Sequence, residues 1–166
     1  MKRKQEEILY EKEFLALNKE KINYAVCGGV AVILYGYPRF TGDLDLIVDL
    51  DKKNLEKLFD LLIKLKYKLK IPIKKEDFID EKKLKELDTK KNMKVVSFYN
   101  VDDPMKIIDV CVNLPNIQNL LKNKIYKRVI KDLKIPTISK KDLIKMKEAV
   151  ARPLDINDVE NLKKIK

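Results

Sequence analysis

The sequence contains no histidine and no tryptophan, and it has only two cysteines, Cys27 and Cys111. Without histidine, the chain cannot build a Ser–His or Cys–His catalytic pair. Two cysteines alone do not complete a zinc site. Both lie in short apolar runs, which predicts buried free thiols rather than a disulfide. A metal bound by this chain must therefore rely on oxygen ligands, which favours magnesium or manganese.

Long hydrophobic stretches are also absent. No apolar segment reaches the roughly 18 residues of a membrane span, and residues 1–7 lack the apolar stretch of a signal peptide. The length of 166 residues fits one domain. We expect a cytoplasmic protein in which a core over residues 1–138 is closed by a helical pair over residues 139–166.

Lysine and arginine outnumber the acidic residues, and the formal net charge is +11. A basic chain can bind a polyanion such as RNA. A lysine-rich composition also marks thermophiles and AT-rich genomes. The densest lysine stretch, residues 64–94, contains Tyr67 and Phe78, which could stack on bases. The alternative is a solvated lysine face offset by nearby carboxylates.

Hydrophobic periodicity and capping residues predict a mixture of helices and strands. Helices are expected over residues 5–20, 30–34, 52–66, 80–87, 117–123, 139–151 and 154–165, with strands over 24–27, 44–49, 93–99 and 105–112. Asp51 and Ser139 are expected N-caps. Residues 67–94 are otherwise weakly patterned, and residues 125–138 are expected to be extended.

The residues that indicate chemistry begin with Gly28 and Gly29 and continue with Asp43 and Asp45. Alternate residues of a strand share a face, which places the two carboxylates roughly 7 Å apart along one face. Two such carboxylates can share divalent metal ions. The glycines let a backbone approach a phosphate, with no side chain of their own in the way, and a helix that starts there would direct N–H groups at it.

Asp109 is a single charge inside an apolar strand, which is costly unless the charge is paired or bound to a metal. Beside the Asp43/Asp45 strand it would complete a three-carboxylate cluster that needs a cation. Alternatively, it faces solvent from a one-sided sheet. Arg39, one of only four arginines, could contact a phosphate or form a salt bridge that shapes its loop.

Together these residues resemble the nucleotidyltransferase superfamily, which has the DNA polymerase beta-like fold. That superfamily combines a Gly-Gly or Gly-Ser helix start, a carboxylate pair and a third carboxylate on a later strand. The run from Gly36 to Leu46 and the C-terminal run from Asp142 to Leu162 look most like the AbiEii/AbiGii toxin-type branch and the minimal nucleotidyltransferases.

The resemblance implies an α/β (α+β) fold with a mixed twisted sheet flanked by helices. It implies that Asp43, Asp45 and Asp109 are catalytic and bind Mg²⁺ or Mn²⁺. The nucleoside triphosphate, such as ATP, would be bound by Gly28, Gly29, Arg39 and Lys147. For Lys147 the alternative is a salt bridge to Asp155 or Asp158 that joins the last two helices, and for Arg152 a structural role at the helix junction is favoured.

The implied reaction transfers a nucleoside monophosphate from the triphosphate to an acceptor hydroxyl on RNA, a protein or a small molecule. The resemblance to the toxin-type branch also implies that the protein could belong to a toxin–antitoxin system. The alternative is a non-catalytic binding module of the same fold, acting as an antitoxin or as an RNA- or protein-interaction partner. Nucleotide and divalent-metal binding, together with transfer of a label, would distinguish the two.

Overall fold

The computed structural model of the protein describes residues 8–130 and 132–166, and within them seven strands form one mixed sheet in the order β3-β4-β5-β2-β1-β7-β6. The strands are β1 Tyr24–Cys27, β2 Asp43–Val48, β3 Tyr67–Leu69, β4 Val95–Asn100, β5 Ile107–Cys111, β6 Ile125–Ile130 and β7 Leu133–Thr137. The central strands β1 and β2 are antiparallel, whereas β2–β5 and β1–β7 are parallel. This is the mixed sheet that the sequence predicts.

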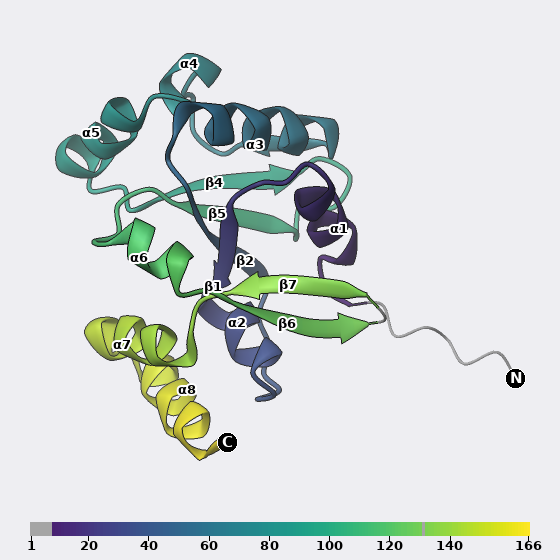
Figure 1. The fold of residues 1–166 in the computed structure, drawn as a ribbon. Helices are drawn as coiled ribbons and strands as arrows, with labels where there is room; N and C mark the ends of the chain where they lie inside the picture. Colours follow the sequence, from purple (N-terminus) through teal and green to yellow (C-terminus); the bar gives the residue numbers. More distant parts are fainter. Residues whose placement is uncertain (1–7, 131) are drawn as a thin grey trace, which may run out of the picture.

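Helices cover the sheet and its two ends. They are α1 Glu11–Lys19, α2 Gly28–Leu34, α3 Lys52–Lys64, α4 Lys75–Phe78, α5 Glu81–Lys91, α6 Ile117–Lys122, α7 Lys140–Val150 and α8 Pro153–Lys164. In Figure 1, α3, α4 and α5 lie together at the top, and α7 and α8 form a pair at the bottom beside the C-terminus. Within the described ranges, no helix combines the length and the apolar character needed to cross a membrane.

Capping side chains place the starts of two helices as predicted. The Asp51 carboxylate accepts a hydrogen bond from the Lys53 backbone N–H at 2.8 Å and begins α3. The Ser139 hydroxyl accepts one from the Asp142 N–H and begins α7. Each cap satisfies a backbone donor that the helix itself leaves without a partner.

The structure differs from the sequence prediction in two segments. Residues 67–94 contain the short strand β3 and the one-turn helix α4 besides the expected α5. Residues 125–138 form a hairpin, β6–β7, instead of one extended segment. The hairpin is hard to predict because β6 is mostly exposed at the sheet edge and lacks regular alternation of buried and exposed side chains. Residues 5–7 of the first expected helix lie outside the described residues.

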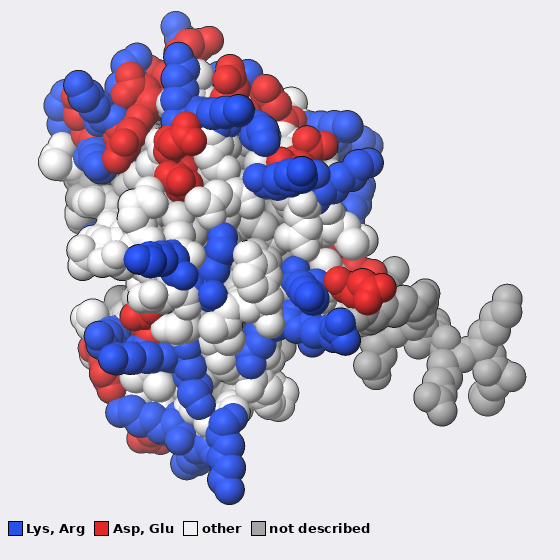
Figure 2. All heavy atoms as spheres, viewed as in Figure 1, with Lys and Arg blue, Asp and Glu red and all other residues white. Residues whose placement is uncertain are grey.

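Five of the twelve lysines in the lysine-dense stretch pair with acidic neighbours. Its ion pairs within the described residues are Lys66–Asp102, Lys75–Asp60, Lys83–Asp77, Lys85–Glu81 and Lys90–Glu86. In the upper part of Figure 2, over α3, α4 and α5, blue and red side chains accordingly alternate. These pairs offset part of the lysine charge, and an RNA track along residues 64–94 stays a prediction.

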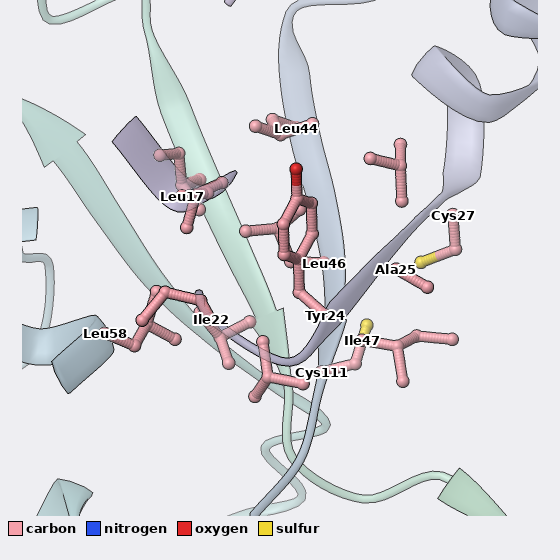
Figure 3. Close-up of a cluster of buried hydrophobic side chains, with 14 of the residues drawn as sticks. Leu17, Ile22, Tyr24, Ala25, Cys27, Leu44, Leu46, Ile47, Leu58 and Cys111 are labelled. Carbon is pink, nitrogen blue, oxygen red and sulfur yellow. The ribbon is translucent and has the colours of Figure 1, made fainter. Parts of the chain in front are cut away.

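One apolar core fills the space between the sheet and the helices, and Figure 3 shows part of it around Tyr24 and Leu46. Cys27 and Cys111 are free and buried, as predicted. Their sulfur atoms point toward one another in Figure 3. The hydrogen bond between the two thiols and their burial raise the pKa of Cys27. The cysteines therefore behave as small core side chains.

Candidate active site

Strand pairing aligns two of the predicted carboxylates directly. Asp45 of β2 lies opposite Asp109 of the parallel strand β5, and Asp43 lies opposite Ile107. Residues opposite one another share a sheet face, and alternate residues of one strand do as well. Asp43, Asp45 and Asp109 therefore project from the same face of the two central strands.

The row that contains Asp45 and Asp109 extends across two further strands. Cys27 of β1 lies opposite Asp45, and Ser97 of β4 lies opposite Asp109. The Ser97 hydroxyl donates a hydrogen bond to Oδ1 of Asp109 at 2.5 Å. Because a single serine in strand β4 resembles any exposed strand residue, sequence reasoning missed it; only the register shows its place.

The Tyr10 hydroxyl connects the starts of the two strands that carry the carboxylates, β2 and β5. It donates to the Gly42 carbonyl, just before β2, and accepts from the Ile107 N–H at the start of β5. Burial raises the pKa of Tyr10 to about 12, so the phenol stays protonated. One side chain thus joins the loop before Asp43 to the strand that carries Asp109.

Close approach explains both glycines at the start of α2. Gly28 has φ +64, and a Cβ there would lie 2.0 Å from Oδ2 of Asp45. A Cβ on Gly29 would lie 2.6 Å from Oγ1 of Thr41 and 3.2 Å from a guanidinium nitrogen of Arg39. The sequence predicts that the glycines leave the backbone open to a phosphate. In the structure, the space that a Cβ would take at each glycine is next to the side chains of Asp45, Thr41 and Arg39.

A network of ion pairs joins this loop to the last two helices. Asp158, which is fully buried, pairs with Arg39 and, at 2.7 Å, with Lys147, itself buried. Asp155 lies 3.4 Å from Lys147 and 2.7 Å from Arg152. The salt bridges considered for Arg39, Lys147 and Arg152 are all present. The hydrogen bond from Arg152 also holds the pKa of Asp155 below its usual value.

All the predicted site residues line one cavity of about 490 Å³, although they come from distant parts of the chain. They are Gly28, Gly29, Arg39, Asp43, Asp45, Asp109 and Lys147. The lining that sequence reasoning did not assign to the site consists of Phe40, Thr41, Gly42, Arg152, Leu154 and Asp155. The wall thus combines four carboxylates, Asp155 among them, with cations from the loop 36–42 and the α7–α8 junction.

The carboxylates in this cavity oppose one another's ionisation. Burial, followed by the charges of Asp109 and Asp43, raises the pKa of Asp45 to about 7. Burial and the charge of Asp109 also raise the pKa of Asp43. Both pKa values rise because like charges lie close together in a site with little water. A bound cation would lower them again.

The donor set fits a hard cation, because three carboxylates without nitrogen or sulfur ligands suit magnesium or manganese. As they are placed, no three cysteine, aspartate or glutamate side chains of the described residues form a group that could hold a metal ion. Asp43, Asp45 and Asp109 would therefore have to rotate to converge on one ion. The predicted metal site stays a prediction.

Comparisons with known proteins give structural but not sequence relatives. No protein-family model matches the chain, and no curated protein matches it. The lincosamide antibiotic adenylyltransferase LnuA, solved with lincomycin bound, matches with a TM-score of 0.62 and 21% identity, over 94% of this chain and 98% of its own. A candidate nucleotidyltransferase from Thermotoga maritima matches with a TM-score of 0.53 and 16% identity, over 92% of this chain and 87% of its own.

At these identities the likeness concerns the fold, and it extends over nearly the whole chain. Membership of the nucleotidyltransferase superfamily and closeness to the AbiEii/AbiGii branch stay predictions. The mixed sheet, its flanking helices and the C-terminal helical pair together have the fold of nucleotidyltransferases.

Proposed function

We propose that this protein is a metal-dependent nucleotidyltransferase. An acceptor hydroxyl oxygen attacks the α-phosphorus of a nucleoside triphosphate. A new phosphorus–oxygen bond forms, the bond between the α-phosphorus and the bridging oxygen breaks, and pyrophosphate leaves with that oxygen. The observation that carries the proposal is the convergence of three aspartates and a double glycine on one cavity, within a fold shared with LnuA.

The three aspartates have distinct proposed roles. Asp43, Asp45 and Asp109 would hold the divalent cations, and Asp109 would also take the proton of the acceptor hydroxyl. Magnesium would neutralise phosphate charge and orient the reacting oxygens. The Ser97 hydroxyl holds Oδ1 of Asp109 by a hydrogen bond, and this bond would have to adjust as the carboxylate turns toward a metal ion.

The triphosphate would lie against the backbone N–H groups of Gly28 and Gly29, on the cationic side of the cavity. Arg39 and Lys147 both form ion pairs with Asp158. The negative charge of Asp158 therefore weakens the attraction that either cation exerts on a phosphate. Arg152 lines the same cavity, and its side chain is 72% exposed. We therefore add Arg152 to the residues proposed to contact the triphosphate.

The test is transfer of a nucleotide label. The protein is incubated with Mg²⁺, each α-labelled nucleoside triphosphate and, separately, total RNA, total protein or lincomycin, the molecule bound in the LnuA structure. Label should transfer from an α-labelled but not from a γ-labelled donor. Asp45→Asn and Asp109→Asn should abolish transfer, whereas Asp102→Asn, at an exposed ion pair with Lys66, should retain it. Transfer that survives both active-site changes would refute the proposal.

A non-catalytic module of the same fold is the second candidate, because the carboxylates would have to move to form a metal group. It predicts nucleotide binding without label transfer to any acceptor. Equilibrium binding of a non-hydrolysable triphosphate, measured beside the transfer assay, separates the two functions. A role in a toxin–antitoxin system stays a prediction, tested by whether expression of the chain arrests growth.

A further inference from the structure

A second, basic cavity of about 430 Å³ lies where the β6–β7 hairpin meets α1. We call it the hairpin basin and define it by Lys21, Tyr24, Lys124, Tyr126 and Lys134. It shares no lining residue with the aspartate cavity. Strand β1 begins in the basin at Tyr24 and ends at Cys27, beside Gly28. The basin therefore lies roughly 10 Å, one short strand, from the start of α2.

The charge of the hairpin basin is not neutralised locally. Among the residues described, no carboxylate lines it, and none lies within 4.0 Å of the ammonium group of Lys21, Lys124 or Lys134, in contrast to the paired lysines of α4 and α5.

Lys124 is held in place without a carboxylate. Its ammonium group donates to Oδ1 of Asn23 at 2.8 Å and to the Tyr24 carbonyl at 3.3 Å. Burial lowers the pKa of Lys124, and the charge of Asp49, which bonds to Asn23, offsets this only in part. A phosphate oxygen would supply the missing negative charge at a cation whose position is already fixed.

Tyr126 adds an aromatic surface beside these cations. Its side chain is 61% exposed, although it lies on a strand paired with β7. Two residues further along the same edge strand, and on the same face, lies the exposed Arg128. An exposed ring among cations along a strand edge is the arrangement that binds single-stranded nucleic acid, through base stacking and phosphate contacts.

We propose that the hairpin basin binds single-stranded RNA, with one base stacked on Tyr126 and flanking phosphates at Lys21, Lys124 and Lys134. The volume of about 430 Å³ accommodates a nucleotide-sized group. The proposal concerns binding outside the aspartate cavity, so it stands or falls separately from nucleotidyl transfer.

The test is fluorescence anisotropy with a labelled 12-nucleotide single-stranded RNA, titrated with the full chain at several salt concentrations. Tyr126→Ala should weaken binding about tenfold, and Tyr126→Phe should largely restore it, because stacking needs only the ring. Replacing Lys21 and Lys134 by Gln should reduce the log–log salt slope by about 1.4, since each phosphate contact on a single strand contributes about 0.7 through counterion release.

The matched control replaces Lys83 and Lys85 by Gln, which removes the same charge from the lysine-dense stretch and should leave the slope nearly unchanged. Lys124 is left intact because its change could disturb the start of β1. Absence of RNA binding would overturn the proposal, as would equal effects of the two double variants. Binding that inorganic phosphate abolishes at low millimolar concentration, with no effect of Tyr126→Ala, would identify a small-anion site instead.

Discussion

Burial and two neighbouring carboxylates oppose the ionisation of Asp45, whose pKa rises to about 7. In the unfolded chain an aspartate ionises near pH 4. The folded protein without metal thus binds this proton more tightly than the unfolded chain does. Its contribution to stability is fully present below about pH 4 and is lost as the pH rises through about 7.

Asp45→Asn should therefore stabilise the metal-free protein at pH 8, by about 5 °C in Tm, because the amide carries no charge. At pH 4 the difference should nearly vanish, since Asp45 is then protonated. Thermal unfolding in EDTA at the two pH values measures both effects. A variant that is less stable than the parent at pH 8 would contradict the assigned repulsion.

The backbone at Gly28 is restricted both by its φ of +64 and by Asp45, whose Oδ2 would lie 2.0 Å from an added Cβ. Gly28→Ala should lower the free energy of unfolding by about 2 kcal/mol or more, since a left-handed alanine alone costs roughly 1–2 kcal/mol. Urea unfolding measures the change.

Gly42 provides the matched stability control for that substitution. A Cβ at Gly42 would meet nothing within 4 Å. Gly42→Ala should therefore change the free energy of unfolding by less than about 0.5 kcal/mol. Equal losses for the two variants would show that the proximity of Asp45 is not the cause.

At the scale of elements, α7 and α8 are joined to each other and to the loop 36–42 by buried charges. Lys147 of α7 and Arg39 of the loop both pair with Asp158 of α8. A second pair between the same helices, Lys163–Glu148, is exposed. The Lys147–Asp158 and Lys163–Glu148 pairs both join α7 to α8, but only the first is buried. Comparing them therefore shows how much burial of an ion pair contributes to the free energy of unfolding.

Asp158→Asn should lower the free energy of unfolding by up to about 3 kcal/mol, because it leaves the buried Lys147 with only the more distant carboxylate of Asp155, at 3.4 Å, as a counterion. Glu148→Gln breaks the exposed pair and should cost less than about 1 kcal/mol. Chemical unfolding monitored by circular dichroism measures both changes. Similar small losses in the two variants would indicate that water reaches Lys147.

At the scale of the whole molecule, we propose that residues 1–138 and 139–166 form one folding unit. The links between them include the Arg39–Asp158 pair and the hydrogen bond that the Asn157 side-chain amide donates to the Tyr37 hydroxyl. The full chain should therefore unfold in one cooperative transition, with coincident midpoints by circular dichroism and tyrosine fluorescence. Two separated midpoints would show that the helical pair is independent of the core.

Short-range sequence features were sufficient to predict most elements of the fold. The central strands, the first and last helices and the Asp51 and Ser139 caps follow from alternation, periodicity and side-chain chemistry, which act within a few residues. The β6–β7 hairpin and β3 did not follow, because edge strands are only partly buried and their apolar pattern is weak. The run from Gly28 to Asp45 and the lone Asp109 also indicated the chemistry of the candidate site before its geometry was known.

What only the tertiary structure decided are the relations between distant residues. The alignment of Asp45 with Asp109, the bond from Ser97, and the choice of Asp158 as the partner of both Arg39 and Lys147 depend on strand register and helix packing. Charge shows the same division. Composition determines the net charge of +11, but the fold decides which lysines meet a carboxylate and which, as in the hairpin basin, do not.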